Sequence, residues 1–163
     1  MRSHLCLAVV GLVVAAAPLV QGQDPSAKNI VGVWRVAERT VVGPGAKPIT
    51  SVQPGIRIFT QRHYSFTDDT SDTPRPELPA NPTDKQRSDV FTPFTAQAGT
   101  YEIKGNEITF RRLAAKSPVN VRPGSFGIST FRFEGSGTLW LTTKANQSGP
   151  VASPVTIKLT RIE

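Results

Sequence analysis

Few side chains in this sequence are suited to making or breaking bonds. The chain contains one cysteine, Cys6, and only one histidine, His63, lies beyond residue 22. Protein metal sites are built largely from His and Cys, so we predict no metal site. A Ser–His–Asp arrangement would depend on His63, and no serine has the Gly-x-Ser-x-Gly context of a nucleophile elbow. We therefore predict no catalytic residues and no cofactor, and we interpret His63 as a strand-edge residue.

Three acidic residues, Asp68, Asp69 and Asp72, have a spacing that resembles the start of a calcium loop. The glycine and the terminal glutamate of that pattern are missing. We therefore interpret this stretch as a solvated acidic loop rather than a cation site.

Glu38 and Arg112 are two charged residues that strand alternation places on inner faces. Trp34 and Glu38 share one face of the first predicted strand, and Phe110 leads to Arg112 on the fifth. Buried charges are costly unless they pair with each other, with water or with a ligand. A mostly apolar cavity with a few polar groups is typical of a small-molecule site. The alternative is that both residues lie near a barrel mouth and are solvated.

The elements that must position these residues are strands, because alternating β-prone runs recur between short turns. Lys104-Gly105-Asn106 and Glu134-Gly135-Ser136-Gly137 are turn signals of two hairpins. We expect eight strands, joined mostly by short turns as an antiparallel up-and-down meander. The predicted ranges are 33–42, 56–60, 63–67, 101–103, 107–112, 125–133, 138–143 and 155–161.

One long connection interrupts this pattern, at about 68–98. It contains five prolines and six of the twelve acidic residues. Proline lacks an amide donor and fixes φ, so this segment is unsuited to a helix interior or a central strand. We predict a surface loop with one helical turn near 84–89, whose end at 90–94 packs back against the barrel.

The two chain ends are predicted to meet at a closed end of the barrel. In such a barrel the first and last strands are neighbours, and alternation places Trp34 and Arg161 on their inner sides. We therefore expect the Arg161 guanidinium to stack on the Trp34 indole as a structural lid.

Several further side chains on predicted inner faces complete a candidate ligand site. An eight-stranded barrel either fills its interior with side chains or holds one small ligand, and the sequence favours neither. The candidate ligand-binding residues are Val36, Glu38, Tyr64, Phe66, Tyr101, Phe110, Arg112 and Phe131.

Residues 1–22 have the features of a secretory signal peptide, with a basic start and an apolar stretch from Leu5 to Val20. The alternative is a membrane anchor, but the stretch is shorter than the roughly 20 residues that a span needs. We expect cleavage after Gly22, a single domain at 23–163, a secreted or periplasmic location and no stable membrane anchor.

The net charge of +7 raises the question of an anionic partner. The basic residues are spread singly along the strands, as at Arg57 and Arg132, without a dense Lys/Arg block. We interpret them as solubilising surface and predict no nucleic-acid binding.

The run Val31-Gly32-Val33-Trp34-Arg35-Val36 resembles the Gly-x-Trp opening of the lipocalins. Over residues 29–163 the chain is similar to the bacterial lipocalin-like domain, in the calycin group, with further matches at 58–60, 63–66, 98–103, 139–141 and 159–161. This resemblance implies an eight-stranded β-barrel that carries a ligand. The proline-rich excursion and the missing disulfide depart from the typical lipocalin pattern.

We therefore expect an exported barrel that binds a small hydrophobic ligand without catalysis. One alternative is an isomerase- or hydrolase-type enzyme that uses Glu38, Arg112 or His63 on a hydrophobic substrate, which rests on fold analogy. The other is a filled barrel whose long loop binds a protein. The sequence says nothing about oligomeric state.

Overall fold

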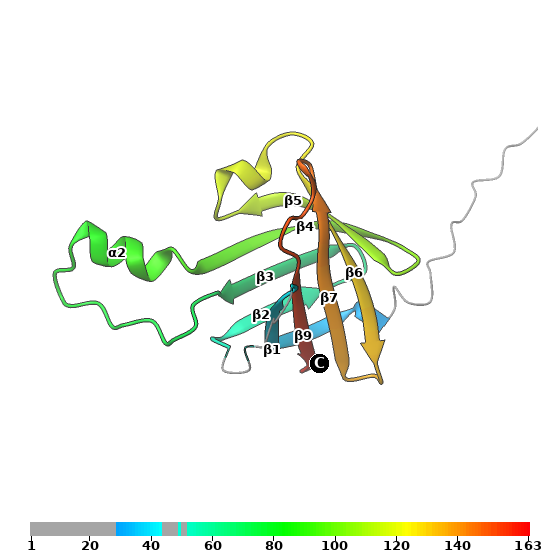
Figure 1. The fold of residues 1–163 in the computed structure, drawn as a ribbon, viewed down its shortest axis with the longest axis horizontal. Coiled ribbons are helices and arrows are strands. Elements are labelled where there is room, and N and C mark those ends of the chain that lie inside the picture. The colour runs from blue at the N-terminus through cyan, green and yellow to red at the C-terminus, as the bar shows by residue number, and fades with distance from the viewer. Residues whose placement is uncertain (1–28, 44–48, 50–51) are drawn as a thin grey trace, which may run out of the picture.

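The computed structural model describes residues 29–43, 49 and 52–163, so the predicted signal peptide lies outside the described residues. Within them the chain forms nine antiparallel strands, one α-helix and one short 3-10 helix (Figure 1). The strands are β1 (Gly32–Val41), β2 (Gly55–Phe59), β3 (His63–Asp69), β4 (Phe94–Lys104), β5 (Glu107–Ala115), β6 (Phe126–Glu134), β7 (Thr138–Asn146), β8 (Gly149–Pro150) and β9 (Val155–Arg161). The helices are α2 (Asp84–Phe91) and η1 (Pro118–Val121).

Eight of these strands close into a barrel. Each of β1 to β6 pairs with the next strand in sequence, β6 pairs with β7, β7 with β9, and β9 returns to β1. The two-residue β8 adds only a short pairing to the end of β7. The eight predicted strands are therefore confirmed, as is the closed all-antiparallel β-barrel. The lipocalin-like resemblance is thereby confirmed at the level of the fold.

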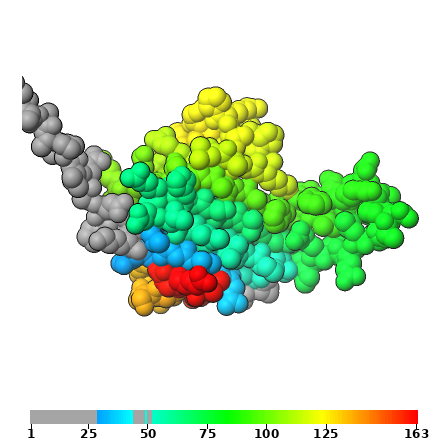
Figure 2. Space-filling model, turned by 180° about the vertical axis from the view of Figure 1, so that it is seen from behind, coloured from blue at the N-terminus to red at the C-terminus, as the bar shows by residue number. Residues whose placement is uncertain are grey.

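The predicted long loop is present but shorter than 68–98. Asp68 and Asp69 still belong to β3, and β4 already begins at Phe94. Low-propensity residues such as Ala96 and Gln97 extend β4 because they pair with β3 along its whole length. The excursion between these strands projects from the barrel as a lobe that carries α2 (Figure 2).

The expected helical turn is the two-turn helix α2. A capping box at Thr83 and Gln86 begins it, because each side chain satisfies the other residue's free amide. The prediction that residues 90–94 pack back against the barrel was wrong for the helical part. No residue of α2 is buried, and Phe91 is 57% exposed.

Apolar side chains fill one half of the barrel. The five largest fully buried side chains lie toward the end of the barrel where Trp34 pairs with Arg161, which we call the packed end; they are Ile30, Trp34, Ile108, Leu139 and Leu159. Aromatic rings extend this core, with Phe59 against Tyr101 at 5.5 Å and Tyr64 against Phe110 at 4.7 Å between ring centroids. We refer to this half as the packed half and to the opposite half as the hollow half.

Three β-bulges shift the alternation of side chains in the barrel. Register shifts leave Ala37 on β1, Leu113 on β5 and Lys144 on β7 without a partner in the adjacent ladder. A bulge adds one residue, so every side chain beyond it changes faces. The bulge at Ala37 therefore reverses the faces of Glu38 and Arg39.

Candidate small-molecule cavity

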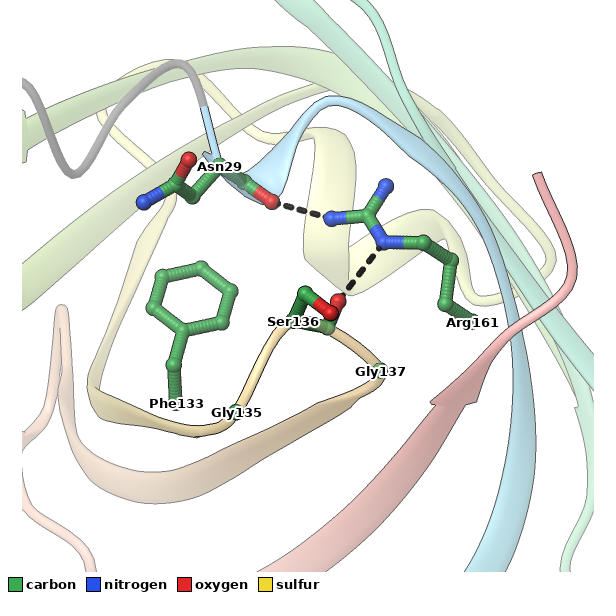
Figure 3. Close-up of a pocket in the computed structure, with 6 residues that line it drawn as sticks. All are labelled: Asn29, Phe133, Gly135, Ser136, Gly137 and Arg161. Atoms are coloured by element: carbon green, nitrogen blue, oxygen red, sulfur yellow. Dashed lines mark hydrogen bonds between the residues drawn. The ribbon is translucent and has the colours of Figure 1, made fainter.

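The structure has a hollow at the packed end, of about 440 Å³, and a second cavity inside the hollow half, of about 220 Å³. The hollow at the packed end is lined by Asn29, Phe133, Gly135, Ser136, Gly137 and Arg161 (Figure 3). The hollow at the packed end and the cavity of the hollow half differ in how their arginine side chains are bonded.

Arg161 has no free donor nitrogen in the packed-end hollow. Its Nε donates to the Ser136 carbonyl oxygen at 3.0 Å, and its Nη2 donates to that of Asn29 at 2.5 Å (Figure 3). Its Nη1 donates to the carbonyl oxygens of Val31 and Glu163. The guanidinium also lies 4.1 Å from the centroid of the buried Trp34 ring, so the expected lid contact is present. These contacts join the chain ends and engage each nitrogen of the guanidinium in a structural hydrogen bond.

The cavity of the hollow half combines apolar walls with a few polar groups. Its apolar lining is Phe66, Phe110, Ile128, Leu141, Ala145, Val151, Val155 and Ile157. Its other lining residues are Arg57, Gln97, Arg112, Gly127, Ser129, Thr143 and Asn146. This composition is typical of a binding site for a small molecule.

Arg57 is one of two arginines that line this cavity. It lies opposite Trp34 on β1 and Phe66 on β3, and its guanidinium stacks on the Phe66 ring at 4.3 Å. Its Nη2 donates to Oδ2 of Asp68 at 2.5 Å, and both residues are at least nine-tenths buried. The interpretation of Arg57 as solubilising surface was therefore wrong, and so was that of Asp68 as part of a solvated loop.

The directions of the side chains on β2 explain why Arg57 is buried. Ile56 and Ile58 point outward and are 38% and 41% exposed, while Arg57 and Phe59 point inward. The inward position of Arg57 follows from its parity with the core residue Phe59. That parity was the available signal in the sequence.

Arg112, the second arginine, enters the cavity from β5. Its Nε donates to Oε1 of Gln97 at 2.9 Å, and Nε2 of Gln97 donates to the Tyr64 hydroxyl at 3.2 Å. A Cβ atom on Gly127 would lie 2.9 Å from Nη2 of Arg112. The absence of a side chain at Gly127 therefore makes room for the guanidinium.

Several buried polar atoms around the cavity lack a hydrogen-bond partner among the described residues. They are Nη1 of Arg112, Nε of Arg57 and Oδ1 of Asp68. Buried polar groups in native proteins are almost always paired, so these three atoms have hydrogen-bonding capacity that the described residues do not use. Two of the three are donors on guanidinium groups.

Tyr64, whose hydroxyl accepts a hydrogen bond from Gln97, lies beside the two arginines as a neutral phenol. Burial raises the pKa of Tyr64, and the opposing effects of Arg112, Arg57 and the Gln97 hydrogen bond are smaller. Tyr64 is therefore protonated near neutral pH and adds no negative charge beside the two arginines.

Of the predicted ligand-binding residues, Phe66, Phe110 and Arg112 line the cavity. Val36, Tyr64, Tyr101 and Phe131 are instead buried in the hydrophobic core. The placement of Glu38 was wrong, because the bulge at Ala37 turns it to the outer face, where Lys158 donates to its Oε1 at 2.8 Å.

The enzymatic arrangement considered from the sequence is not formed. Glu38 lies on the outer face with Lys158, and His63 is exposed at the turn between β2 and β3. Arg112 is the one member of the three that enters the cavity.

Asp69 joins the barrel to the long excursion. Its Oδ1 accepts from the amide and the hydroxyl of Ser71, and Arg75 pairs with Oδ2 at 2.6 Å. Nη2 of Arg39, which the bulge at Ala37 turns inward, lies 3.5 Å from the Asp69 carbonyl oxygen. Asp69 is 4% exposed, so its interpretation as a solvated loop residue was also wrong.

These features define the chain as a closed eight-stranded antiparallel barrel with an internal cavity. No protein-family model and no curated protein matches the sequence. The fold is similar to that of a lipocalin-like protein from Bacteroides uniformis, with a TM-score of 0.46 and 14% identity over 82% of this chain and 99% of that one. It is also similar to a redesigned β-barrel, with a TM-score of 0.44 and 11% identity over 84% and 95% of the two chains.

No helix in the described part of the chain is long and apolar enough to cross a membrane. No group of three or more His, Cys, Asp or Glu side chains there is arranged to hold a metal ion.

Proposed function

We propose that the barrel binds one small, largely apolar molecule in the cavity of its hollow half and performs no chemistry on it. The observation that carries this proposal is the cavity itself, at about 220 Å³. Sites for drug-sized ligands are larger, at about 300–1,000 Å³, so the ligand is small. The volume corresponds to about seven waters at their share of ~30 Å³ in the liquid.

The division of the barrel into two halves supports the same function. The packed half contains the five largest fully buried side chains and stabilises the fold without a ligand. The lining of the hollow half includes Phe66, Phe110, Leu141 and Ile157. Transfer of an apolar molecule from water to these walls is favourable at about 25 cal/mol per Å² of buried apolar area.

A cavity-filling variant tests the proposal. Val155 lines the cavity, so Val155→Phe is expected to weaken binding of the neutral probe octanamide at least about 10-fold, as measured by titration calorimetry. Ile58→Phe is the matched control, because Ile58 is 41% exposed on the outside of the barrel and its enlargement leaves the cavity unchanged. No saturable binding of either octanamide or its charged analogue octanoate by the unmodified chain would refute the proposal.

We also propose that the chain is exported to the periplasm or the exterior. This rests on the features of residues 1–22 as a signal peptide. Mass spectrometry of the exported protein is expected to find Gln23 at its N-terminus. Retention of residues 1–22 on a membrane-bound product would refute cleavage.

A further inference from the structure

We propose that the ligand carries a carboxylate group and that Arg112 binds this group inside the cavity. The inference rests on the proposed function, because it specifies the chemistry of the ligand that the cavity holds. It extends the expectation of a largely apolar molecule to a small amphiphilic acid, with its apolar part against the cavity walls.

Arg112 brings a positive charge into the cavity without a matching negative charge. No carboxylate lies within 4.0 Å of its guanidinium in the described part of the chain. Residues 44–51, which connect β1 to β2, contain no Asp or Glu. An arginine stays charged at any physiological pH, so its positive charge persists until an anion neutralises it.

The neighbouring Arg57 shows the contrasting case. The carboxylate of Asp68 neutralises it through the 2.5 Å contact described above. The other polar side chains of the lining, Gln97, Ser129, Thr143 and Asn146, are uncharged. Among the residues that line the cavity, Arg112 is therefore the charge that no carboxylate in the described part of the chain neutralises, and a carboxylate on the ligand would supply the missing negative charge.

The geometry of Arg112 leaves part of its donor fork free for an anion. Gln97 accepts from Nε and so fixes the plane of the guanidinium. Nη1 is buried and has no partner among the described residues. A planar guanidinium that is held at one edge binds a carboxylate oxygen through its remaining donors in a charge-assisted hydrogen bond.

The test compares octanoate with octanamide, which match in shape and differ in charge. At pH 7, titration calorimetry is expected to give octanoate an affinity at least about 10-fold higher, since hydrogen bonds to charged groups exceed neutral ones in strength. Arg112→Met is expected to abolish this preference and to change octanamide affinity less than about 3-fold. Arg111→Met is the matched control, because its side chain is 57% exposed on the same strand.

The outcomes separate the two proposals. Equal binding of octanoate and octanamide by the unmodified chain would overturn the acid-binding role of Arg112 and leave cavity binding intact. Absence of binding for both compounds would overturn both proposals. The comparison on the unmodified chain does not require any variant to fold, and Arg112→Gln provides a second, polar replacement.

Discussion

The guanidinium carbon of Arg161 lies 4.1 Å from the centroid of the Trp34 ring, where the last strand meets the first. Arg161→Met removes this contact and four hydrogen bonds to carbonyl oxygens. We expect a loss of about 2–4 kcal/mol in the free energy of unfolding, measured in urea.

Arg132→Met is the control for this variant. Arg132 also stacks on a tryptophan, Trp140, at 4.5 Å, but on the exposed outer face. An exposed cation–π contact contributes about 0.5–1 kcal/mol, so the loss should be smaller. Equal losses in the two variants would contradict a special role of Arg161 at the chain ends.

The buried pair of Arg57 and Asp68 predicts a strong asymmetry between single and double substitutions. Asp68→Asn leaves the Arg57 charge buried without a counter-charge, and we expect it to cost about 3–5 kcal/mol of unfolding free energy. Arg57→Met combined with Asp68→Leu removes both charges and should recover most of that loss. Urea unfolding measures each variant, and a double variant no more stable than Asp68→Asn would contradict this explanation.

Asp69 predicts a dependence of stability on pH. Burial acts to raise the pKa of Asp69, but the hydrogen bonds from Ser71 and the charge of Arg75 together lower it. A carboxylate with a lowered folded-state pKa stabilises the fold above its unfolded pKa of about 3.9. This contribution is lost as the pH falls through the folded pKa.

The measurement for Asp69 is the unfolding free energy at pH 6 and at pH 3. Asp69→Asn should be less stable than the unmodified chain at pH 6, and the difference should shrink at pH 3. Asp89→Asn is the control, because Asp89 is exposed on α2 and pairs there with Lys85. A difference that is constant between the two pH values would contradict the predicted linkage.

The backbone around Gly99, which pairs with Arg112, leaves no room for a side chain at this position. A Cβ atom there would lie 1.9 Å from the carbonyl oxygen of Arg111. Gly99→Ala must therefore move the bulge between β4 and β5, and we expect a loss of about 1–3 kcal/mol in the free energy of unfolding. Gly137→Ala, where nothing lies within 4 Å, should stay within about 0.5 kcal/mol. Thermal or urea unfolding compares them.

Removal of the Lys116 amino group is expected to let the long excursion between β3 and β4 open more readily. Its Nζ donates to the carbonyl oxygens of Phe91 and, at 2.8 Å, of Phe94, on either side of the C-terminal end of α2. Lys116→Met should increase trypsin cleavage at Lys85 and Arg87 about 2- to 10-fold, since each lost hydrogen bond lowers the cost of opening. Lys104→Met, at an exposed position, should leave the rate unchanged. Mass spectrometry of the fragments measures the rates.

The order of the strands was predictable from the sequence because local signals agree with the fold. Gly105 and Gly135 adopt positive φ angles of 60° and 62° in the turns that the sequence marks. The contact between Trp34 and Arg161 was predictable for the same reason, since closure of an up-and-down barrel pairs the first strand with the last.

The errors in the candidate site have two physical causes. The bulge at Ala37 has no strong local signature, so alternation carried past it assigned Glu38 to the wrong face. In β2 Ile56 and Ile58 point outward while Arg57 points inward beside Phe59, so an arginine takes a position that is usually apolar. The burial of Asp68 follows from this placement, because a neutralising partner is needed wherever Arg57 is buried.

The separation of the packed half from the hollow half also sets where this protein can change. The five largest fully buried side chains, among them Trp34 and Leu159, do not line the cavity, whereas half-buried residues such as Thr143 and Val151 do. Substitutions at such half-buried cavity positions are therefore expected to change the lining with a smaller loss of folding stability than substitutions at Trp34 or Leu159. Such a division makes the barrel a suitable scaffold for directed evolution of new binding specificities, with diversity confined to the hollow half.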